Sequence, residues 1–343
     1  MQDIHISNGY IQLWASYLKK QQIEPLSAEF LKDLHSQLGN LIDQPFDAEV
    51  PLTLLMDVLE RTAQHLHCPR LIFDIVQEIR PEHFGVLGYM ASKSSTLAEI
   101  IRYIMRFQRL VIDGHEFVPV QFKQNANNIE LYWGFIHEKY NLLNELTMAA
   151  MVQLGRDILD AQPFVLQSVS FAHAASMAPQ HYQKFYAAEV RFQQKNYVLK
   201  IDIRKLNLQL DHRDPMLLQL LVRQAEEKIA AKQATDTIIQ RAEKIIAETL
   251  RVEQRAIKIE QLAAQLYLSI RSLQREYAAQ GSSFKKILEQ ERIKRCDILL
   301  QHGSSLSDIA EQLDYSDQSA LARAYKAATG QTLVTRRKQL QQP

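Results

Sequence analysis

Residues 263–277 read AAQLYLSIRSLQREY, and residues 310–325 read AEQLDYSDQSALARAY. At a constant offset of 47 positions the two stretches share five residues, in the pairs Ala263/Ala310, Gln265/Gln312, Leu266/Leu313, Ser269/Ser316 and Ser272/Ser319. A helix-turn-helix unit needs a small residue where its helices cross, a sharp turn, and a residue that caps the second helix. The repeat therefore predicts two helix-turn-helix units built on one plan.

The second helix of each unit also has an apolar face. Leu273 and Tyr277 in the first unit, and Leu321 and Tyr325 in the second, are four residues apart and share one side of a helix. The connector SFKKILEQERIKRCDILLQ between the units is amphipathic and long enough for a helix of roughly 27 Å. Successive major grooves on one face of DNA are about 34 Å apart. Two copies on such a connector favour a reader of DNA.

The part of the chain from residue 236 onward is predicted to be all-α. It reads as seven helices, near residues 237–250, 258–266, 270–279, 283–301, 305–312, 317–328 and 332–340. The expected N-caps are Ser269, Ser282, Ser305 and Ser316.

The part before residue 211 mixes helical and strand-like segments. Helical periodicity appears in residues 10–21, 52–66, 96–111, 141–159 and 178–188, and strand-like runs in residues 116–124, 128–136, 164–174 and 197–203. This predicts an α+β domain, residues 1–210, with one small sheet covered by helices. A helix starting at Pro215 is expected to form a linker, residues 211–235, to the C-terminal domain, residues 236–343.

Charge is distributed unevenly between these parts. Residues 236–343 contain 17 Lys and Arg against 13 Asp and Glu, whereas residues 1–235 contain 23 against 26. A basic C-terminal part on a mildly acidic body is the direction expected for a polyanionic partner.

Several other classes of protein find no support in the sequence. No apolar run is long enough for a bilayer, no export signal is visible at the start, and the two cysteines, Cys68 and Cys296, fit a reducing compartment, so we expect a cytoplasmic protein. The stretch HLHC (65–68) has metal-ligand residue types but no second pair nearby. No motif for an enzyme, a cofactor or a metal is therefore predicted.

Residues 258–340 resemble the DNA-binding domain of the AraC/XylS family of bacterial transcription regulators. The stretches that carry the resemblance are SIRSLQREYAAQGSSFKKILEQERIKRCDILL (269–300) and LSDIAEQLDYSDQSALARAYKAATGQT (306–332), with the closing arginines. The sequence departs from the family pattern at Tyr267 and Asp314, where glycine is frequent, at Ala320 and Leu321, and at Leu333, where proline is usual. These departures concern the packing of the second helix-turn-helix unit.

The resemblance implies which exposed residues meet double-stranded DNA. Arg pairs with guanine and Gln with adenine in the major groove, whereas phosphate contacts position the protein without specifying sequence. The expected contacts are Ser269, Arg271, Ser272, Gln274 and Arg275 in the first unit and Gln318, Ser319, Arg323 and Lys326 in the second, with Lys285, Arg336, Arg337 and also Lys326 at phosphates. Activation of a nearby promoter through RNA polymerase is a further implication.

Residues 1–210 more loosely resemble the arabinose-binding-like sensor domain of these regulators, through residues 80–104 and 181–203. That resemblance implies a domain that senses a small effector and possibly forms homodimers. Bulky apolar residues favour a hydrophobic, lipid-like effector. The candidate contacts are Phe84, Tyr89, Tyr103, Phe107, Tyr132, Trp133, Phe135, Met148, Met151 and Phe171.

Three alternatives stay open from the sequence. An amino acid or other carboxylate effector would need cationic anchors, for which Arg102, Arg106 and Arg109 are available. The protein is otherwise an effector-independent regulator or an adaptor whose first domain binds another protein. A homodimer would use a helix near 141–160 or the segment 216–230, where Leu217, Leu221 and Ile229 form an apolar stripe. The alternative is that either segment packs within its own chain.

Overall fold

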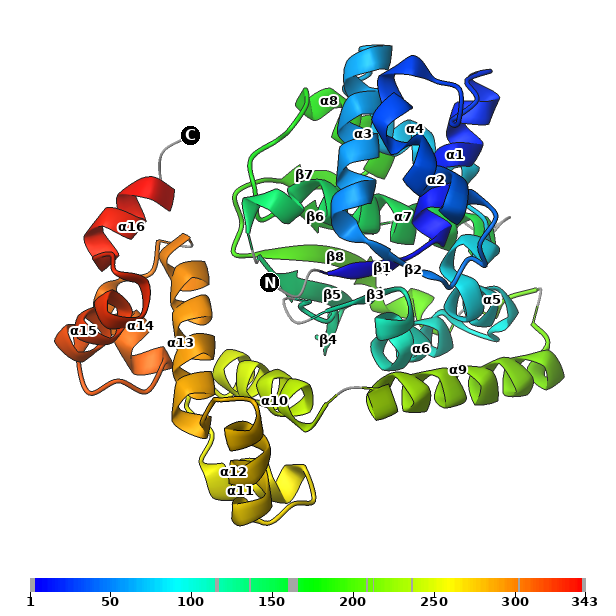
Figure 1. Ribbon diagram of the computed structural model, residues 1–343. Coiled ribbons are helices and arrows are strands. Elements are labelled where there is room, and N and C mark those ends of the chain that lie inside the picture. Colours follow the sequence, from blue (N-terminus) through cyan, green and yellow to red (C-terminus); the bar gives the residue numbers. More distant parts are fainter. Residues whose placement is uncertain are drawn as a thin grey trace. The chain divides into compact units, whose positions relative to one another are not determined.

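The computed structural model describes residues 4–114, 117–135, 137–159, 166–207, 209–211, 213–235, 237–301 and 303–340. The chain forms two compact units, residues 1–230 and 231–343. The first unit is α+β and the second is all-α, as predicted, and Figure 1 shows every labelled strand in the first. Within the described ranges no helix is both long and apolar enough to cross a bilayer.

A five-stranded sheet in the order β4-β5-β8-β6-β7 forms the main scaffold of the first unit. Its strands are β4 (Gln121–Gln124), β5 (Asn128–Gly134), β6 (Leu166–Ser170), β7 (Glu189–Arg191) and β8 (Asn196–Asp202), and only β6 and β7 pair in parallel. Alternate residues of β5 and β8 are buried, because successive side chains of a strand point to opposite faces. One face of the sheet therefore contributes Leu131, Trp133 and Leu199 to the core.

A second, smaller sheet was not predicted. It has the order β2-β1-β3, with β1 (His5–Ser7), β2 (Glu49–Pro51) and β3 (Ile112–Asp113). The expectation of a single sheet was wrong because strands of two or three residues are too short to show an alternating pattern. This sheet brings together segments about a hundred residues apart in sequence.

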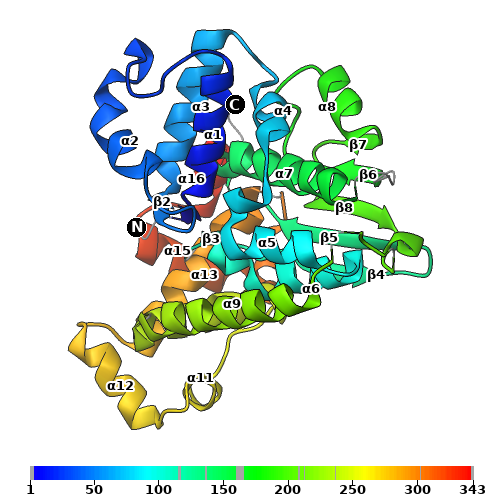
Figure 2. The same ribbon diagram turned by 90° about the vertical axis from the view of Figure 1, so that its right-hand side faces the viewer.

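On the five-stranded sheet, the face that carries Glu130, Tyr132 and Lys200 is partly exposed, and helices pack on the opposite face and around the smaller sheet. They are α1 (Gly9–Lys20), α2 (His35–Ile42), α3 (Leu52–Leu66), α4 (Leu71–Ile75), α5 (Gly85–Lys93), α6 (Leu97–Phe107), α7 (Asn141–Leu159) and α8 (Pro179–Tyr186), with short 3₁₀ segments that include η1 (Glu29–Leu34) and η3 (Pro81–Phe84). Figure 2 shows α7 running across the five-stranded sheet. The Trp133 indole on β5 donates a hydrogen bond to the Asn144 amide oxygen on α7, at 2.8 Å. Helix α7 thus lies between the sheet and the N-terminal helices.

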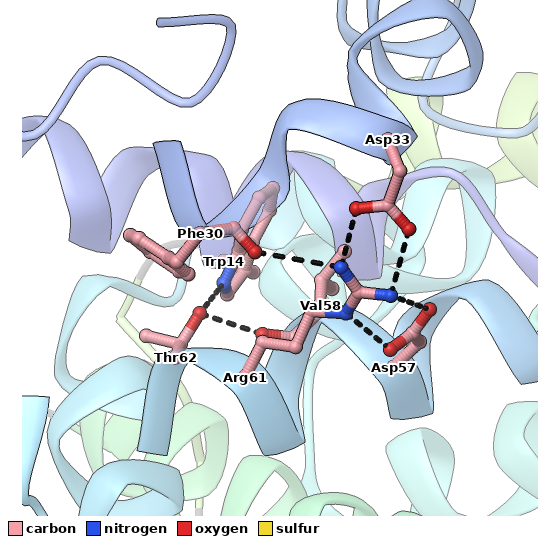
Figure 3. A network of polar contacts seen from close by, with 7 residues as sticks. All are labelled: Trp14, Phe30, Asp33, Asp57, Val58, Arg61 and Thr62. Carbon is pink, nitrogen blue, oxygen red and sulfur yellow. Dashed lines mark hydrogen bonds and ion pairs between the residues drawn. The ribbon is translucent and has the colours of Figure 1, made fainter. Parts of the chain in front are cut away.

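A polar network ties the N-terminal helices together (Figure 3). The Arg61 guanidinium on α3 bonds to Asp57 one turn earlier and to Asp33 on η1. Beside it, the Trp14 indole on α1 donates to the Thr62 hydroxyl at 2.9 Å, so this fully buried tryptophan leaves no unpaired donor. The network connects α1, η1 and α3 into one layer.

The last helix of the first unit is α9 (Pro215–Thr235), which begins in the segment expected to be a linker. Leu218 and Ala225 on α9 are buried against the first unit. Arg106 on α6 forms an ion pair with Glu226 on α9, at 2.7 Å. Leu221 and Ile229, two residues of the suggested dimer stripe, pack partly buried on the same core. Those two residues are therefore engaged within the chain itself.

In residues 237–301 and 303–340, the second unit contains the seven helices that were predicted. They are α10 (Ile238–Val252), α11 (Ile259–Gln265), α12 (Ile270–Ala279), α13 (Phe284–Gln301), α14 (Leu306–Gln312), α15 (Gln318–Thr329) and α16 (Leu333–Leu340). Ser269 and Ser305 cap α12 and α14 as expected. The other two cap predictions were each one residue early, because the Ser283 hydroxyl accepts at the start of α13 and the Asp317 carboxylate accepts at the start of α15.

Candidate nucleic-acid interface and effector cavity

The first helix-turn-helix unit consists of α11 and α12. Ala263 on α11 is 2% exposed, which allows α12 to cross closely. Tyr267 in the turn has φ +56°, a left-handed conformation that glycine adopts more easily, and its side chain points into solvent with 92% of its surface exposed. Leu273 and Tyr277 then attach α12 to the core, as predicted. The opposite face of α12 is left open.

The second helix-turn-helix unit, α14 and α15, follows the same plan with one extra residue after the turn. Ala310 is buried at the crossing and Asp314 adopts φ +62°, both 47 positions after Ala263 and Tyr267. The cap and the buried residues of α15 instead stand 48 positions after those of α12, since Asp317, Leu321 and Tyr325 match Ser269, Leu273 and Tyr277. Pairing Ser269 with Ser316 and Ser272 with Ser319 was therefore wrong for the second helix.

This shift changes which side chains are equivalent in the two reading helices. Arg275 on α12 corresponds to Arg323 on α15, and Arg271 corresponds to Ser319. The sequence comparison missed the extra residue because the strongest matches, Ala, Gln and Leu, lie before the turn. The two units thus present one arginine in common and differ at the neighbouring positions.

Helix α13 connects the two helix-turn-helix units (Figure 1), and polar contacts fix the second of them to α13. The Tyr325 hydroxyl on α15 donates to Asp297 on α13 at 2.5 Å, and Arg336 on α16 pairs with the same carboxylate at 3.2 Å. Arg292 on α13 donates to the backbone oxygen of Asp314 in the turn, at 3.1 Å. The second helix-turn-helix unit is therefore held to α13 by hydrogen bonds as well as by apolar packing.

Most of the residues expected to contact DNA are exposed on the reading helices or beside them. The exposed ones are Ser269, Arg271, Gln274, Arg275, Lys285, Gln318, Ser319, Arg323 and Lys326, and Ser272 is half-buried. Leu273 and Tyr277 on the inner face of α12, and Leu321 and Tyr325 on that of α15, are buried. Each reading helix therefore presents a row of Arg, Gln and Ser side chains outward.

Three expected contacts also have bonds within the protein. The Ser269 hydroxyl accepts from the Ser272 amide at 3.1 Å as the cap of α12. Arg336 is held by Asp297, which raises the pKa of its guanidinium through a side-chain hydrogen bond. Arg337 donates to the backbone oxygen of Ser304 at 2.6 Å. These three side chains therefore also stabilise the fold. Arg336 and Arg337 are not free for phosphate contacts alone.

A cavity of about 150 Å³ lies inside the first unit, between the sheet and helices α5, α6 and α7. Its wall comes from strands β5 and β8, from the three helices and from the segment 117–120. Nearly all of the side chains are aliphatic or aromatic, and within the described residues none of those lining it is Asp, Glu, Lys, Arg or His. The described lining residues can therefore accept apolar surface but offer no counter-ion.

Three of the ten candidate effector contacts line this cavity: Phe84, Trp133 and Met151. The others lie elsewhere, namely Tyr89, Tyr103, Phe107, Tyr132, Phe135, Met148 and Phe171. Tyr132 faces away because it alternates with Leu131 and Trp133 along β5. Phe171 belongs to a separate aromatic cluster with Tyr182 and Phe192. Composition identified bulky residues but not the side of each element that they occupy.

Sequence reasoning missed the polar groups of the wall. The Gln108 side chain accepts from the Val120 amide at 2.6 Å and donates back to the Val120 oxygen at 3.3 Å. Asn144 is bonded to Trp133 and to the Tyr140 backbone oxygen. The hydroxyl of Thr147 on α7 is buried without a hydrogen-bond partner. A lone threonine in a helix has no sequence signal that would have identified it.

Comparison with known families agrees with both parts of the structure. Residues 38–210, half of the chain, match the model described as the arabinose-binding domain of AraC transcription regulators, N-terminal. The chain belongs to the AraC family. Residues 262–339 match a helix-turn-helix domain model, which covers both units and α13. This AraC-family protein is thus a helix-turn-helix transcription regulator with an N-terminal ligand-binding domain.

Two curated relatives are similar to this AraC-family chain at low identity. It is 26% identical over 297 residues to the HTH-type transcriptional regulator VirS of Mycobacterium tuberculosis, covering 85% of each chain. It is 22% identical over 271 residues to the ornithine utilization regulator of Pseudomonas aeruginosa, covering 76% of each. Among solved structures, the transcriptional regulator CdpR from Pseudomonas aeruginosa aligns over 96% of this chain and 98% of its own, with 15% identity and a TM-score of 0.42.

Proposed function

We propose that this protein is a cytoplasmic, sequence-specific transcription activator controlled by a small hydrophobic effector in the cavity of its first unit. The observation that carries the DNA part is the pair of open helix faces, α12 and α15, joined by α13. An α13 of 18 residues is about 27 Å long, which is comparable with the distance of about 34 Å between successive major grooves.

On this proposal, Arg271, Gln274 and Arg275 read bases from α12. Gln318, Ser319 and Arg323 do so from α15, and Lys285 and Lys326 contact phosphates. Arg336 and Arg337 contribute less to DNA binding, because their internal bonds to Asp297 and Ser304 compete with phosphate. Contact with RNA polymerase and formation of a homodimer are further parts of the proposal that the family resemblance suggests.

An amino-acid or carboxylate effector is less well supported. One relative is named for ornithine utilization, but two of the three candidate anchors here are already used. Arg106 pairs with Glu226, and Arg109 pairs with Asp113 at 2.9 Å. A charged effector in the apolar cavity would lose its hydration without gaining a counter-ion, which is strongly unfavourable.

The DNA part is tested by selecting binding sites from random duplexes with the purified full-length protein. We expect enrichment of two short blocks with centres about 10 base pairs apart, one block for each reading helix. Transcription from a promoter that carries the selected site would then be measured with and without the protein, and an increase supports activation. Enrichment of one block alone, or of none, would contradict paired reading.

A further inference from the structure

The size of the cavity restricts what it can hold. A cavity of about 150 Å³ lined by aliphatic and aromatic side chains is large enough for benzene, as known for an engineered protein cavity of this volume. A long acyl chain has several times as many heavy atoms as a benzene ring. The cavity therefore fits a compact molecule better than the lipid-like effector that composition suggested.

The electrostatics of the wall restrict the charge of the occupant. Within the described residues the lining contains no ionisable acid or base other than the tyrosines Tyr10 and Tyr140. Burial raises the pKa of Tyr10 to about 12, while the neighbouring Thr147 hydroxyl opposes that rise, so Tyr10 is neutral at physiological pH. A carboxylate or an ammonium group would find no counter-ion among these described residues. The occupant should be neutral.

The polar atoms of the wall restrict where an oxygen of the occupant can bond. Gln108 and Asn144 are already bonded to the backbone and to Trp133. The Thr147 hydroxyl is buried beside Tyr10, with which it interacts only weakly and forms no hydrogen bond of good geometry. A buried hydroxyl that lacks a partner is unfavourable, and a ligand oxygen at this position would satisfy it.

We infer that the cavity binds a neutral molecule about the size of one aromatic ring, with a single hydroxyl or carbonyl oxygen that bonds to Thr147. The inference rests on the proposed function, because it names the chemical class of the effector. Thr147 sets the orientation of that molecule, and the aliphatic wall from α5 and α6 encloses its apolar body.

The test uses the full-length protein and five probes: benzyl alcohol, toluene, benzoate, benzylammonium and palmitate. Binding is measured by titration calorimetry and by tryptophan fluorescence, to which Trp133 in the wall contributes together with Trp14. We expect benzyl alcohol to bind most tightly of the ring-sized probes and toluene next. Benzoate and benzylammonium should bind at least about a hundredfold more weakly than benzyl alcohol, because a buried unpaired charge is disfavoured.

Two variants locate the site and its polar anchor. Thr147→Val keeps the shape of the side chain and removes the hydroxyl, so it should weaken benzyl alcohol binding about tenfold and change toluene binding less than about twofold. Ala150→Leu adds atoms to a buried wall residue and should abolish binding of both probes while the fold keeps its melting temperature. Thr53→Val, at an exposed position outside this cavity, is the matched control and should change neither.

Several results would overturn the inference. They are tight binding of benzoate or palmitate that Ala150→Leu removes, binding of benzyl alcohol that neither variant changes, and no binding of any neutral ring. In each case, selection of a two-block DNA site would leave the proposed DNA-binding function standing. If instead the neutral ring binds as expected and no DNA site is selected, the proposed function fails and the ligand class stands.

Discussion

Arg271 and Lys285 illustrate how two exposed cations of one domain are expected to differ in function. Arg271 lies on the outer face of α12, whereas Lys285 lies at the start of α13. Arg271→Ala should cost about 1–3 kcal/mol of binding free energy at one base position, and so relax the selected sequence there. Lys285→Ala should weaken binding to all sequences alike and lower the salt dependence by about one unit. Measuring affinity for the selected site and its single-base variants, at several salt concentrations, separates the two outcomes. Full discrimination in the Arg271 variant would mean that α12 is turned differently on DNA.

His83 on η3 makes the stability of the first unit depend on pH. Its imidazole is 5% exposed, and Nδ1 accepts a hydrogen bond from the Arg80 amide at 3.0 Å. Burial lowers the pKa of His83 from 6.5 to about 4. The unfolded chain therefore binds this proton at a higher pH than the folded chain does. The contribution to stability is complete above pH 6.5 and is lost as the pH falls towards 4, by roughly 2–3 kcal/mol.

Chemical denaturation of the first unit between pH 7 and pH 4 measures this effect. His83→Gln should flatten the decline in the free energy of unfolding, since glutamine does not titrate and can still accept from the Arg80 amide. His65→Gln, which changes an exposed histidine, serves as control and should leave the decline intact. An unchanged slope in the His83 variant would assign the pH dependence to other groups.

At the scale of elements, Gly88 shows why α5 and η3 can lie against each other. A Cβ at Gly88 would stand 1.9 Å from the backbone oxygen of Pro81, far inside any real contact. Gly85, at the start of helix α5, adopts φ +53°, a left-handed conformation that favours glycine, whereas Gly88 lies inside the helix and is needed for close packing.

Gly88→Ala should therefore destabilise the protein by about 1–3 kcal/mol, because backbone must move to make room. The matched variant is Gly39→Ala on helix α2, where the added Cβ would have its nearest neighbour at 4.0 Å. That variant should stabilise by about 0.5–1 kcal/mol, as alanine favours helix more than glycine. Thermal melting of both proteins gives the comparison, and equal melting temperatures would contradict the packing argument.

How far the elements follow from sequence depends on their length. Helices α3 and α7 and the seven helices of the second unit were predicted because their apolar residues recur over several turns. Strands β1, β2 and β3 were missed because two or three residues show no period. The cap at Asp317 was misplaced because Ser316 beside it is equally suitable by residue type, and only the backbone decides between them.

The candidate sites divide in the same way. Exposure of Arg271, Gln274 and Arg323 was foreseen, since a helix with buried Leu and Tyr on one side must show its other side to solvent. The cavity was not, because the walls come from segments distant in sequence that only the folded chain brings together. Thr147 matters solely because its neighbours are apolar.

At the scale of the whole molecule, paired reading predicts a dependence on DNA phase. Inserting 5 base pairs between the two selected blocks turns the second block to the opposite side of the duplex, about half a helical turn away. Affinity should then fall to that of a site with one block. Inserting 10 base pairs restores the phase but should lower the affinity in the same way, because α13 has a fixed length and cannot span the larger distance. Electrophoretic mobility shifts on the three duplexes test this. Equal affinity for all of them would show that the units bind independently.

The additional residue after the turn of the second helix-turn-helix unit decides how base specificity can be transferred from α12 to α15. Transplanting the base preference of α12 onto α15 requires counting forward 48 positions, so that Ser319→Arg and Ala322→Gln reproduce Arg271 and Gln274 beside the existing Arg323. A graft designed at 47 positions would instead put the new arginine at Gln318 and the glutamine at Leu321, in the interior. The first chimera should recognise a direct repeat of one block, while the second should fail to fold.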